Sequence, residues 1–322
     1  MNDIKQKIES TYKSLDTEEW IDRHFTRPIG YLWALFFRRL HVHPNAVTIM
    51  SILLGMGAAW MFYYRDLVHN LVGVLLLMWA NFYDSCDGQL ARMTGQKTRW
   101  GRMLDGLAGD IWFFCIYVAL CLRLQGQDIP LTHHPWGPWI YIVAIVCGLF
   151  FHSRQARLAD YYRNIHLFFL SNTGHELDRS ARQQALLCEA RKKRDFWWSV
   201  FLWFYVRYTR AQERSTPHAQ ALLHHVIDER NSQIPDALRQ DFRRGSLPLV
   251  KIANVLTFNC RALVLYASCL LDIPWVYFLV ELIPFTLLAQ LMHRRHEALC
   301  IRILESYNHR NGNYKNHPLP QP

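Results

Sequence analysis

Apolar stretches about as long as a bilayer is thick, separated by basic connections, constrain this chain of 322 residues more than any other feature. A helix needs about 20 apolar residues to cross a bilayer, where the backbone must satisfy its own hydrogen bonds. We therefore predict an all-α, polytopic integral membrane helical bundle of about six transmembrane helices, with a kink at Pro284 in the last one. The expected spans are 46–64, 67–83, 106–122, 138–152, 252–271 and 274–292.

The chain is basic, with a formal net charge of +10, and its Lys and Arg residues concentrate in alternate connections. If the amino terminus is cytoplasmic, nearly all of them face the cytoplasm, as the positive-inside rule requires. A charge of this size suits nucleic acid or an anionic membrane surface. The sequence contains no nucleic-acid motif, so the membrane explains the charge better. The eight cysteines have no metal-ligand spacing, and no cleavable signal peptide is visible.

The sequence divides into five expected regions. They are cytoplasmic and interfacial helices (1–44), spans one to four (45–158), a helical cytoplasmic or interfacial insertion (159–251), spans five and six (252–293) and a basic cytoplasmic tail (294–322). Within the first region, residues 28–43 predict an amphipathic helix that is too short to span and suits the membrane interface. The insertion contains an aromatic run, 195–208, expected on the membrane surface or buried against the bundle. A lid, a dimer contact and an acyl-chain guide remain open as its role.

Residues 84–110, DSCDGQLARMTGQKTRWGRMLDGLAGD, combine carboxylates, glycines and an arginine beside apolar segments. Carboxylates there are costly unless they bind a cation. On a helix, Asp84 and Asp87 point within about 60° of each other. Mg²⁺ prefers such oxygens and shares them with phosphate, while Gly88 leaves space and Arg92 suits a phosphate. We predict a metal site that holds a phosphate; the plain alternative is an Asp-Gly turn with solvated charges.

The full pattern D-x2-D-G-x2-A-R-x8-G-x3-D resembles the signature of the CDP-alcohol phosphatidyltransferase family. It is met here by Asp84, Asp87, Gly88, Ala91, Arg92, Gly101 and Asp105. The resemblance implies an enzyme that moves a lipid phosphate from a CDP-linked donor to an alcohol, releasing CMP. It also implies two divalent ions, Mg²⁺ or Mn²⁺, on the donor diphosphate.

The resemblance assigns roles to particular positions. The implied metal ligands are Asp84, Asp87, Asp105 and, in the fourth place, Asp110. The implied donor-binding residues are Gly88, Ala91, Arg92 and Gly101, together with Asn45 and Thr48 from a Pro-Asn-x-x-Thr sequence that opens the first span.

The last carboxylate departs from the family pattern, which continues D-x3-D. Gly109 occupies that position, and the next carboxylate is Asp110. Side chains five residues apart differ by about 140° around a helix, against about 40° for four. We hypothesise a single-turn π-bulge near 106–109 that returns Asp110 to the site as fourth ligand or general base. If Asp110 does not return to the site, Asp105 is the expected general base.

The acceptor site is less defined. The fourth span ends in QARLAD, which resembles the Lys-Ala-Arg-x-Glu sequence of members that use phosphorylated polyols, with Gln155 replacing lysine. Arg154 and Arg157 are therefore expected to hold the acceptor phosphate, or to be ordinary boundary arginines. Arg261, inside the fifth span, is expected to hold the acceptor or to pair with Glu281.

The sequence thus predicts a phospholipid-biosynthesis transferase, integral to a bacterial inner membrane, with its active site at the cytoplasmic face. The expected donor is CDP-diacylglycerol, and the expected acceptor is inositol, inositol phosphate or glycerol phosphate. Transfer of a CDP-linked headgroup to a lipid alcohol, such as diacylglycerol or ceramide, stays open. A membrane cation transporter is the alternative from another class. The expected partners are the lipid donor, the alcohol and the bilayer, with no nucleic acid; a homodimer remains open.

Overall fold

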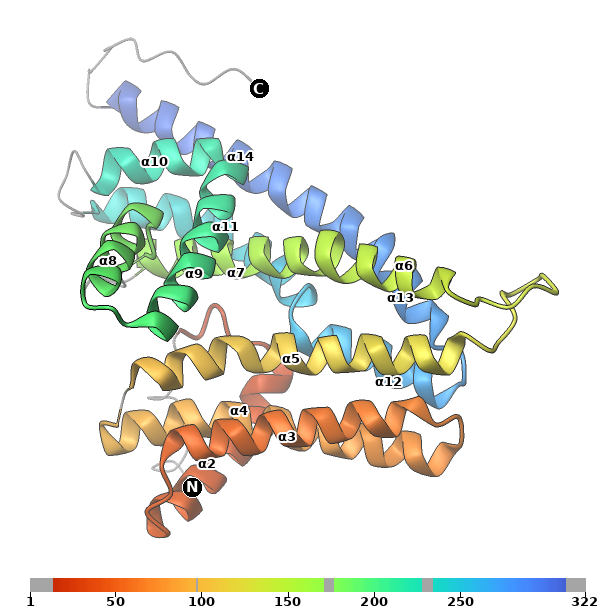
Figure 1. Ribbon diagram of the computed structural model, residues 1–322. Helices are drawn as coiled ribbons and strands as arrows, with labels where there is room; N and C mark the ends of the chain where they lie inside the picture. Colours follow the sequence, from red (N-terminus) through yellow and green to blue (C-terminus); the bar gives the residue numbers. More distant parts are fainter. Residues whose placement is uncertain (1–13, 97, 171–176, 228–233, 311–322) are drawn as a thin grey trace. The chain divides into compact units, whose positions relative to one another are not determined.

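The computed structural model describes residues 14–96, 98–170, 177–227 and 234–310, in which the long elements are all helical (Figure 1). In chain order they are η1 (Asp22–Thr26), α2 (Arg27–Arg39), α3 (Pro44–Tyr63), α4 (Leu67–Thr94), α5 (Arg99–Leu124), α6 (Trp139–Ile145), η2 (Val146–His152), α7 (Ser153–Leu170), α8 (Ser180–Lys192), α9 (Phe196–Ser215), α10 (Pro217–Ile227), α11 (Asp236–Val255), α12 (Phe258–Leu270), α13 (Trp275–Leu282) and α14 (Pro284–Arg310). The labels η1 and η2 mark π-helical stretches.

Six helical stretches are long and apolar enough to cross a membrane, which confirms the predicted all-α polytopic bundle. They are Pro44–Tyr63, Leu67–Thr94, Met103–Leu124, Trp139–Leu170, Asp236–Leu270 and Trp275–Tyr307. Leu67–Thr94 runs beyond the predicted span because the polar motif residues continue the helix instead of ending it, and the last three stretches also extend into polar sequence. The predicted break at Pro284 is confirmed, since α13 ends at Leu282 and α14 begins at the proline.

The predicted amphipathic segment contains a helix, α2, but its place at the membrane interface stays a prediction. Residues 1–13 of the predicted amino-terminal region and 311–322 of the predicted basic tail lie outside the described residues.

The chain forms two compact units. Unit 1 comprises residues 1–154 and 258–286, and unit 2 comprises 155–257 and 287–322. In unit 1, α3 packs along both α4 and α5 (Figure 1). A Cβ added to Gly55 of α3 would lie 2.1 Å from the Trp112 ring of α5, so the missing side chain is what lets these two helices approach. Helix α3 is therefore packed against both motif-bearing helices, α4 and α5.

The ends of these helices are fixed by local capping. The His43 imidazole accepts a hydrogen bond from the Asn45 amide at 3.1 Å, and Pro44 occupies the first turn of α3. The Thr98 hydroxyl accepts from the Gly101 amide at 2.8 Å and starts α5. Gly95, with φ of +71°, ends α4 in the left-handed conformation. Only four residues separate the end of α4 from the start of α5.

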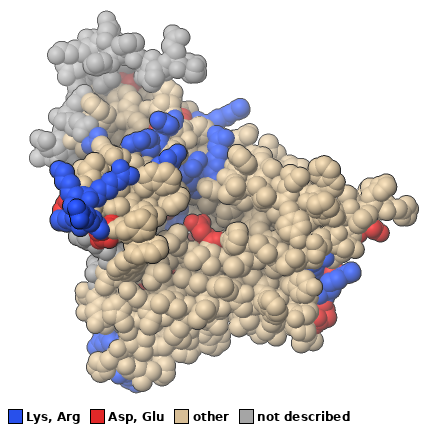
Figure 2. All heavy atoms as spheres, viewed as in Figure 1, with Lys and Arg blue, Asp and Glu red and all other residues tan. Residues whose placement is uncertain are grey.

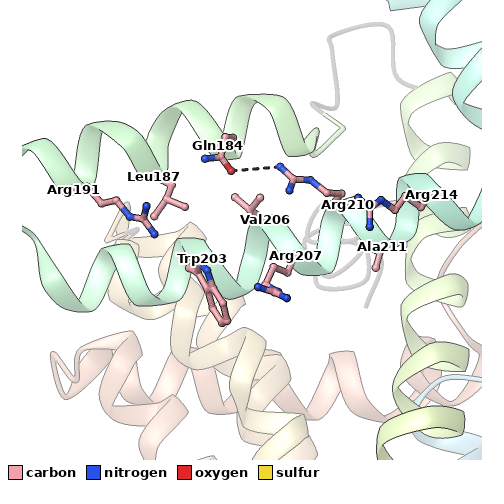
Figure 3. Close-up of a pocket in the computed structure, with 9 residues that line it drawn as sticks. All are labelled: Gln184, Leu187, Arg191, Trp203, Val206, Arg207, Arg210, Ala211 and Arg214. Atoms are coloured by element: carbon pink, nitrogen blue, oxygen red, sulfur yellow. Dashed lines mark hydrogen bonds between the residues drawn. The ribbon is translucent and has the colours of Figure 1, made fainter.

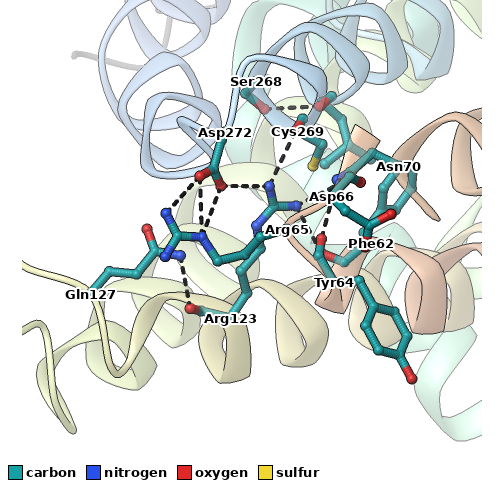
Figure 4. A network of polar contacts seen from close by, with 11 residues as sticks. Phe62, Tyr64, Arg65, Asp66, Asn70, Arg123, Gln127, Ser268, Cys269 and Asp272 are labelled. Carbon is teal, nitrogen blue, oxygen red and sulfur yellow. Dashed lines mark hydrogen bonds and ion pairs between the residues drawn. The ribbon is translucent and has the colours of Figure 1, made fainter. Parts of the chain in front are cut away.

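A buried arginine organises the carboxyl-terminal end of α5 (Figure 4). Arg123 donates to the Phe62 carbonyl at 3.0 Å, the Cys269 carbonyl at 3.2 Å and the Asp272 carboxylate at 2.8 Å. Arg65 donates to the same carboxylate at 2.7 Å. Burial alone would raise the pKa of Asp272, but the hydrogen bonds from these two arginines outweigh it and hold that pKa below its ordinary value. The network joins α3, α5 and α12.

Unit 2 contains a helical hairpin formed by α8 and α9. Its small apolar core is made of Leu187 and Ala190 from α8 with Leu202 and Val206 from α9. The aromatic run of the sequence lies on α9, and this helix is not among those long and apolar enough to span.

Candidate active site

Three carboxylates of the motif converge in unit 1. One oxygen from each of Asp84, Asp87 and Asp105 lies within 4.8 Å of the other two. Hard divalent ions bind oxygens at about 2.0–2.6 Å, so ligands of one ion lie no more than about 5 Å apart. The three side chains thus fit the ligand sphere of one or two such ions. The alternative of an Asp-Gly turn is wrong, because Asp87 and Gly88 lie inside α4.

Asp87 is the most enclosed of the three, with 4% of its surface exposed, whereas Asp105 is exposed. The buried Thr48 hydroxyl of α3 donates a hydrogen bond to the Asp87 carboxylate. This bond orients the Asp87 carboxylate, which has a second oxygen that can also bind a cation. Thr48 is therefore a supporting residue of the kind that orients metal ligands.

A pocket of about 270 Å³ adjoins these carboxylates. It is lined by Pro44, Asn45, Thr48, Asp87, Gly88, Ala91, Arg92, Gln96, Thr98, Gly101 and Asp105. Every residue that the sequence assigned to the CDP-linked donor is among them, although they come from three helices. Carboxylates, an arginine and bare glycine backbone around one pocket can hold a metal ion and a phosphate together.

Gly101 keeps one wall of this pocket open. A Cβ at this position would lie 2.6 Å from Asn45 Oδ1 and 3.0 Å from Thr98 Oγ1. Those two side chains are themselves hydrogen-bonded, with Thr98 Oγ1 donating to Asn45 Oδ1 at 3.1 Å. The starts of α3 and α5 therefore meet at a point where only glycine fits without displacement.

Asp110 does not join the cluster in the way the sequence predicted. Helix α5 is α-helical without interruption from Arg99 to Leu124, so the predicted π-bulge near 106–109 is wrong. Asp110 consequently lies about 140° around the helix from Asp105, and it is not one of the grouped carboxylates found among the described residues. Its exposed side chain instead interacts electrostatically with His152.

His152 belongs to a second polar cluster in unit 1. Its Nδ1 lies 3.2 Å from Glu281 Oε1 and 3.1 Å from Arg261 Nη1. Arg261 donates to both oxygens of Glu281 at 2.5 Å, and the Tyr277 hydroxyl donates to the same carboxylate at 2.9 Å. The pairing of Arg261 with Glu281 is therefore confirmed, while its role toward an acceptor stays a prediction. The other two predicted acceptor arginines, Arg154 and Arg157, do not line the donor pocket.

Sequence reasoning missed some residues of these sites. Thr98 and Gln96 line the donor pocket, and Arg27 of α2 interacts electrostatically with Asp84. Thr98 could have been recognised from the sequence, since threonine is a preferred N-cap residue that bonds an amide of the first helical turn. His152 carries none, because the π-helical stretch η2 that ends with it has no sequence signature.

Comparison with known proteins matches residues 41–166 to the CDP-alcohol phosphatidyltransferase family. A CDP-diacylglycerol–glycerol-3-phosphate 3-phosphatidyltransferase of Rickettsia bellii is 30% identical over 87 residues, 27% of this chain and 48% of the relative. An archaetidylinositol phosphate synthase of Pyrococcus horikoshii is 38% identical over 66 residues, 20% and 34% of the two chains. A bifunctional IPC transferase and DIPP synthase of Aquifex aeolicus is 28% identical over 100 residues, 30% and 21%.

The matched region contains the whole motif, the donor pocket, the first three spans and most of the fourth, and it ends inside α7. The chain spans less than half the length of each of these relatives. What the comparisons show is therefore a match to the CDP-alcohol phosphatidyltransferase family over residues 41–166.

Proposed function

We propose that this chain transfers a phosphatidyl-type group from a CDP-linked donor to an alcohol and releases CMP. The observation that carries the proposal is the convergence of Asp84, Asp87 and Asp105 beside a pocket lined by glycine and arginine. The match of residues 41–166 to the CDP-alcohol phosphatidyltransferase family supports it. The likeness of the region to a CDP-diacylglycerol–glycerol-3-phosphate 3-phosphatidyltransferase and to an archaetidylinositol phosphate synthase supports CDP-diacylglycerol as donor and a polyol or its phosphate as acceptor.

In this proposal the donor diphosphate lies against Arg92, and its cytidine lies along the Gly88 and Gly101 backbone. Two bound Mg²⁺ or Mn²⁺ ions would neutralise the charge that develops on the diphosphate. The acceptor oxygen forms a bond to the phosphatidyl phosphorus as the bond from that phosphorus to the CMP oxygen breaks. The hydroxyl proton passes to a carboxylate. Asp105 is the better placed proton acceptor because it is exposed at the pocket, whereas Asp110 faces another direction.

Charge placement supports a cytoplasmic active site. The sequence from the motif end of α4 to the first turn of α5 contains four basic residues, Arg92, Lys97, Arg99 and Arg102, whereas the opposite ends of these helices have only Arg65 and Arg123. By the positive-inside rule the motif end of α4 lies in the cytoplasm. A water-soluble polyol would reach the pocket from that side. Arg154, Arg157 and Arg261 remain the proposed acceptor-binding residues.

The test is metal-dependent CMP release by the full chain reconstituted in liposomes. CDP-diacylglycerol is offered with inositol, inositol phosphate, glycerol phosphate or serine in separate reactions. We expect release with one acceptor, abolished by EDTA and by Asp87→Asn. Asp195→Asn, which alters a helix cap far along the sequence, controls for loss of one carboxylate. Full activity of Asp87→Asn would refute the site.

Two further results separate the alternatives. Absence of release with all four alcohols, followed by release with a CDP-linked headgroup and diacylglycerol or ceramide, would establish transfer in the other direction. Uptake of a radioactive divalent ion into sealed vesicles, without CMP release under any condition, would establish a cation transporter. The position of the carboxylates in the last turns of α4 and the first turns of α5 disfavours the transporter, whose ion path needs charges along the span.

A further inference from the structure

The hairpin of α8 and α9 in unit 2 contains a groove of about 460 Å³ that the proposed reaction does not use (Figure 3). It lies outside the residues matched to the family. The nine lining residues are Gln184, Leu187, Arg191, Trp203, Val206, Arg207, Arg210, Ala211 and Arg214. Four of the nine are arginines, and none is acidic.

Helical spacing explains why the basic side chains share one groove. Trp203, Arg207, Arg210 and Arg214 follow one another on α9 at intervals of four, three and four residues, which keeps them within a sector of about 60°. Arg191 reaches the same groove from the last turn of α8. Lys and Arg side chains gather over the α8–α9 hairpin on the face shown in Figure 2.

The positive charges of these four guanidinium groups have little negative charge near them. Arg210 donates only to the neutral Gln184 amide oxygen at 3.5 Å, and Arg207 lies over the Trp203 ring at 4.5 Å. No ion pair joins any of the four arginines to a carboxylate within the described residues. Nearby Glu213 accepts two hydrogen bonds from Ser180 instead. Like charges this close repel unless an anion lies between them, and a phosphate fits the guanidinium fork best.

The same helix also presents exposed aromatic side chains. Phe196, Trp197 and Phe204 are 66%, 65% and 61% exposed. Exposed aromatic rings of this kind favour the boundary between lipid headgroups and acyl chains. Lys192 at the end of α8 and Lys193 in the turn that follows add positive charge, which attracts an anionic bilayer. If these rings insert at that boundary, the arginines of the same helix would lie near the lipid phosphates.

From these contacts we infer that the α8–α9 groove binds the phosphate headgroup of an anionic membrane lipid. The arginines hold the phosphate, Trp203 bounds one end of the groove, and the exposed rings insert beside the bound lipid. The inference does not depend on the catalytic proposal, because it rests on unit 2 alone.

The test uses the exposed Cys188, whose sulfur lies 3.9 Å from the groove residue Gln184. The full chain, labelled there with a fluorophore, is reconstituted in phosphatidylcholine nanodiscs that contain acyl-labelled phosphatidic acid or acyl-labelled phosphatidylcholine. We expect energy transfer to favour phosphatidic acid. In Arg207→Gln/Arg214→Gln the apparent affinity should fall on the order of 10- to 30-fold, from about fivefold per basic residue.

The control is Arg295→Gln/Arg302→Gln on α14, which removes two exposed arginines at the same seven-residue spacing without touching the groove. Retained selectivity in this control, with loss in the groove variant, supports the inference. Equal energy transfer to both lipids, or equal loss in both variants, overturns it. Displacement of the lipid by glycerol phosphate in solution, or by a single-stranded oligonucleotide, also overturns it by pointing to a soluble phosphate or nucleic acid.

Discussion

Gly101 offers the sharpest single test of the donor pocket. In Gly101→Ala the added methyl group would lie 2.6 Å from Asn45 Oδ1 and 3.0 Å from Thr98 Oγ1. These distances are shorter than van der Waals contact allows, so the Asn45 amide must turn away and lose its hydrogen bond from Thr98. Because all three residues line the pocket, we expect weaker binding of the CDP moiety.

The size of the effect follows from how the pocket can adjust. Overpacking a filled site costs about 1–3 kcal/mol. Asn45 is a short side chain that can rotate, so the lower half of this range applies, about 1–2 kcal/mol. This corresponds to a roughly 5- to 30-fold increase in the Kd for CDP. The measurement is a CDP titration of the purified protein in Mg²⁺, followed by isothermal calorimetry, with KM for the CDP-linked donor as a second readout.

Gly106→Ala is the matched control, because no atom lies within 4 Å of a Cβ added there and the position is on the same helix. Each substitution should gain a similar helix-forming free energy, about 0.5–1 kcal/mol. The two variants therefore differ mainly in the contact with Asn45. An unchanged Kd for CDP in Gly101→Ala would refute the pocket geometry, as would an equal increase in both variants.

Three further outcomes are expected. Thr48→Val removes the hydrogen bond that orients Asp87 and should weaken Mn²⁺ binding about 10- to 100-fold, whereas Thr48→Ser should retain the affinity. Electron paramagnetic resonance measures the bound Mn²⁺, and unchanged binding in Thr48→Val would contradict the supporting role of Thr48. Arginines lower the pKa of Asp272 in the folded state, so the stability that Asp272 contributes is present above about pH 4 and is lost as the pH falls through that lowered pKa. Asp272→Asn should therefore flatten the acid limb of a plot of Tm against pH. An identical limb in both proteins would count against the network. Arg261→Met leaves the Glu281 carboxylate buried without its main partner and should lower the free energy of unfolding, measured with denaturant, by on the order of 3–5 kcal/mol. The double variant Arg261→Met/Glu281→Leu should recover most of this loss. Equal stability of the single variant and the wild type would show that the pair is dispensable.

The donor pocket was predictable because its residues are specified by local spacing. Asp84, Asp87 and Gly88 share one helix, and fixed helical geometry sets their directions once the helix is assumed. Asn45 and Thr48 joined the pocket through a short sequence at the start of a span. The resemblance supplied the link between these separate stretches, and the packing of α3 against α4 and α5 agrees with it.

The positions of Asp110 and His152 depended on tertiary packing, which the spacing of residues along the sequence does not determine. The prediction for Asp110 assumed that α5 would deform to preserve a carboxylate, but α5 is unbroken, and no atom lies within 4 Å of a Cβ added to Gly106 or Gly109, so no neighbouring contact forces a bulge there. The Arg261 pairing was named among the alternatives because a charge inside a span needs a partner. His152 was not foreseen, since its contact with that pair depends on the tertiary fold.

The π-helical stretch Val146–His152 has a consequence for chain length. A π-turn closes each hydrogen bond one residue later than an α-turn does, so it is the conformation a helix adopts after gaining one residue. Deleting a residue there would return the helix to the ordinary repeat and leave the segments on both sides in their present register. The same deletion in α3 would turn every later side chain of that helix by about 100°. Among homologous chains, the fourth span is therefore where a one-residue difference in length can be accommodated with the least rearrangement.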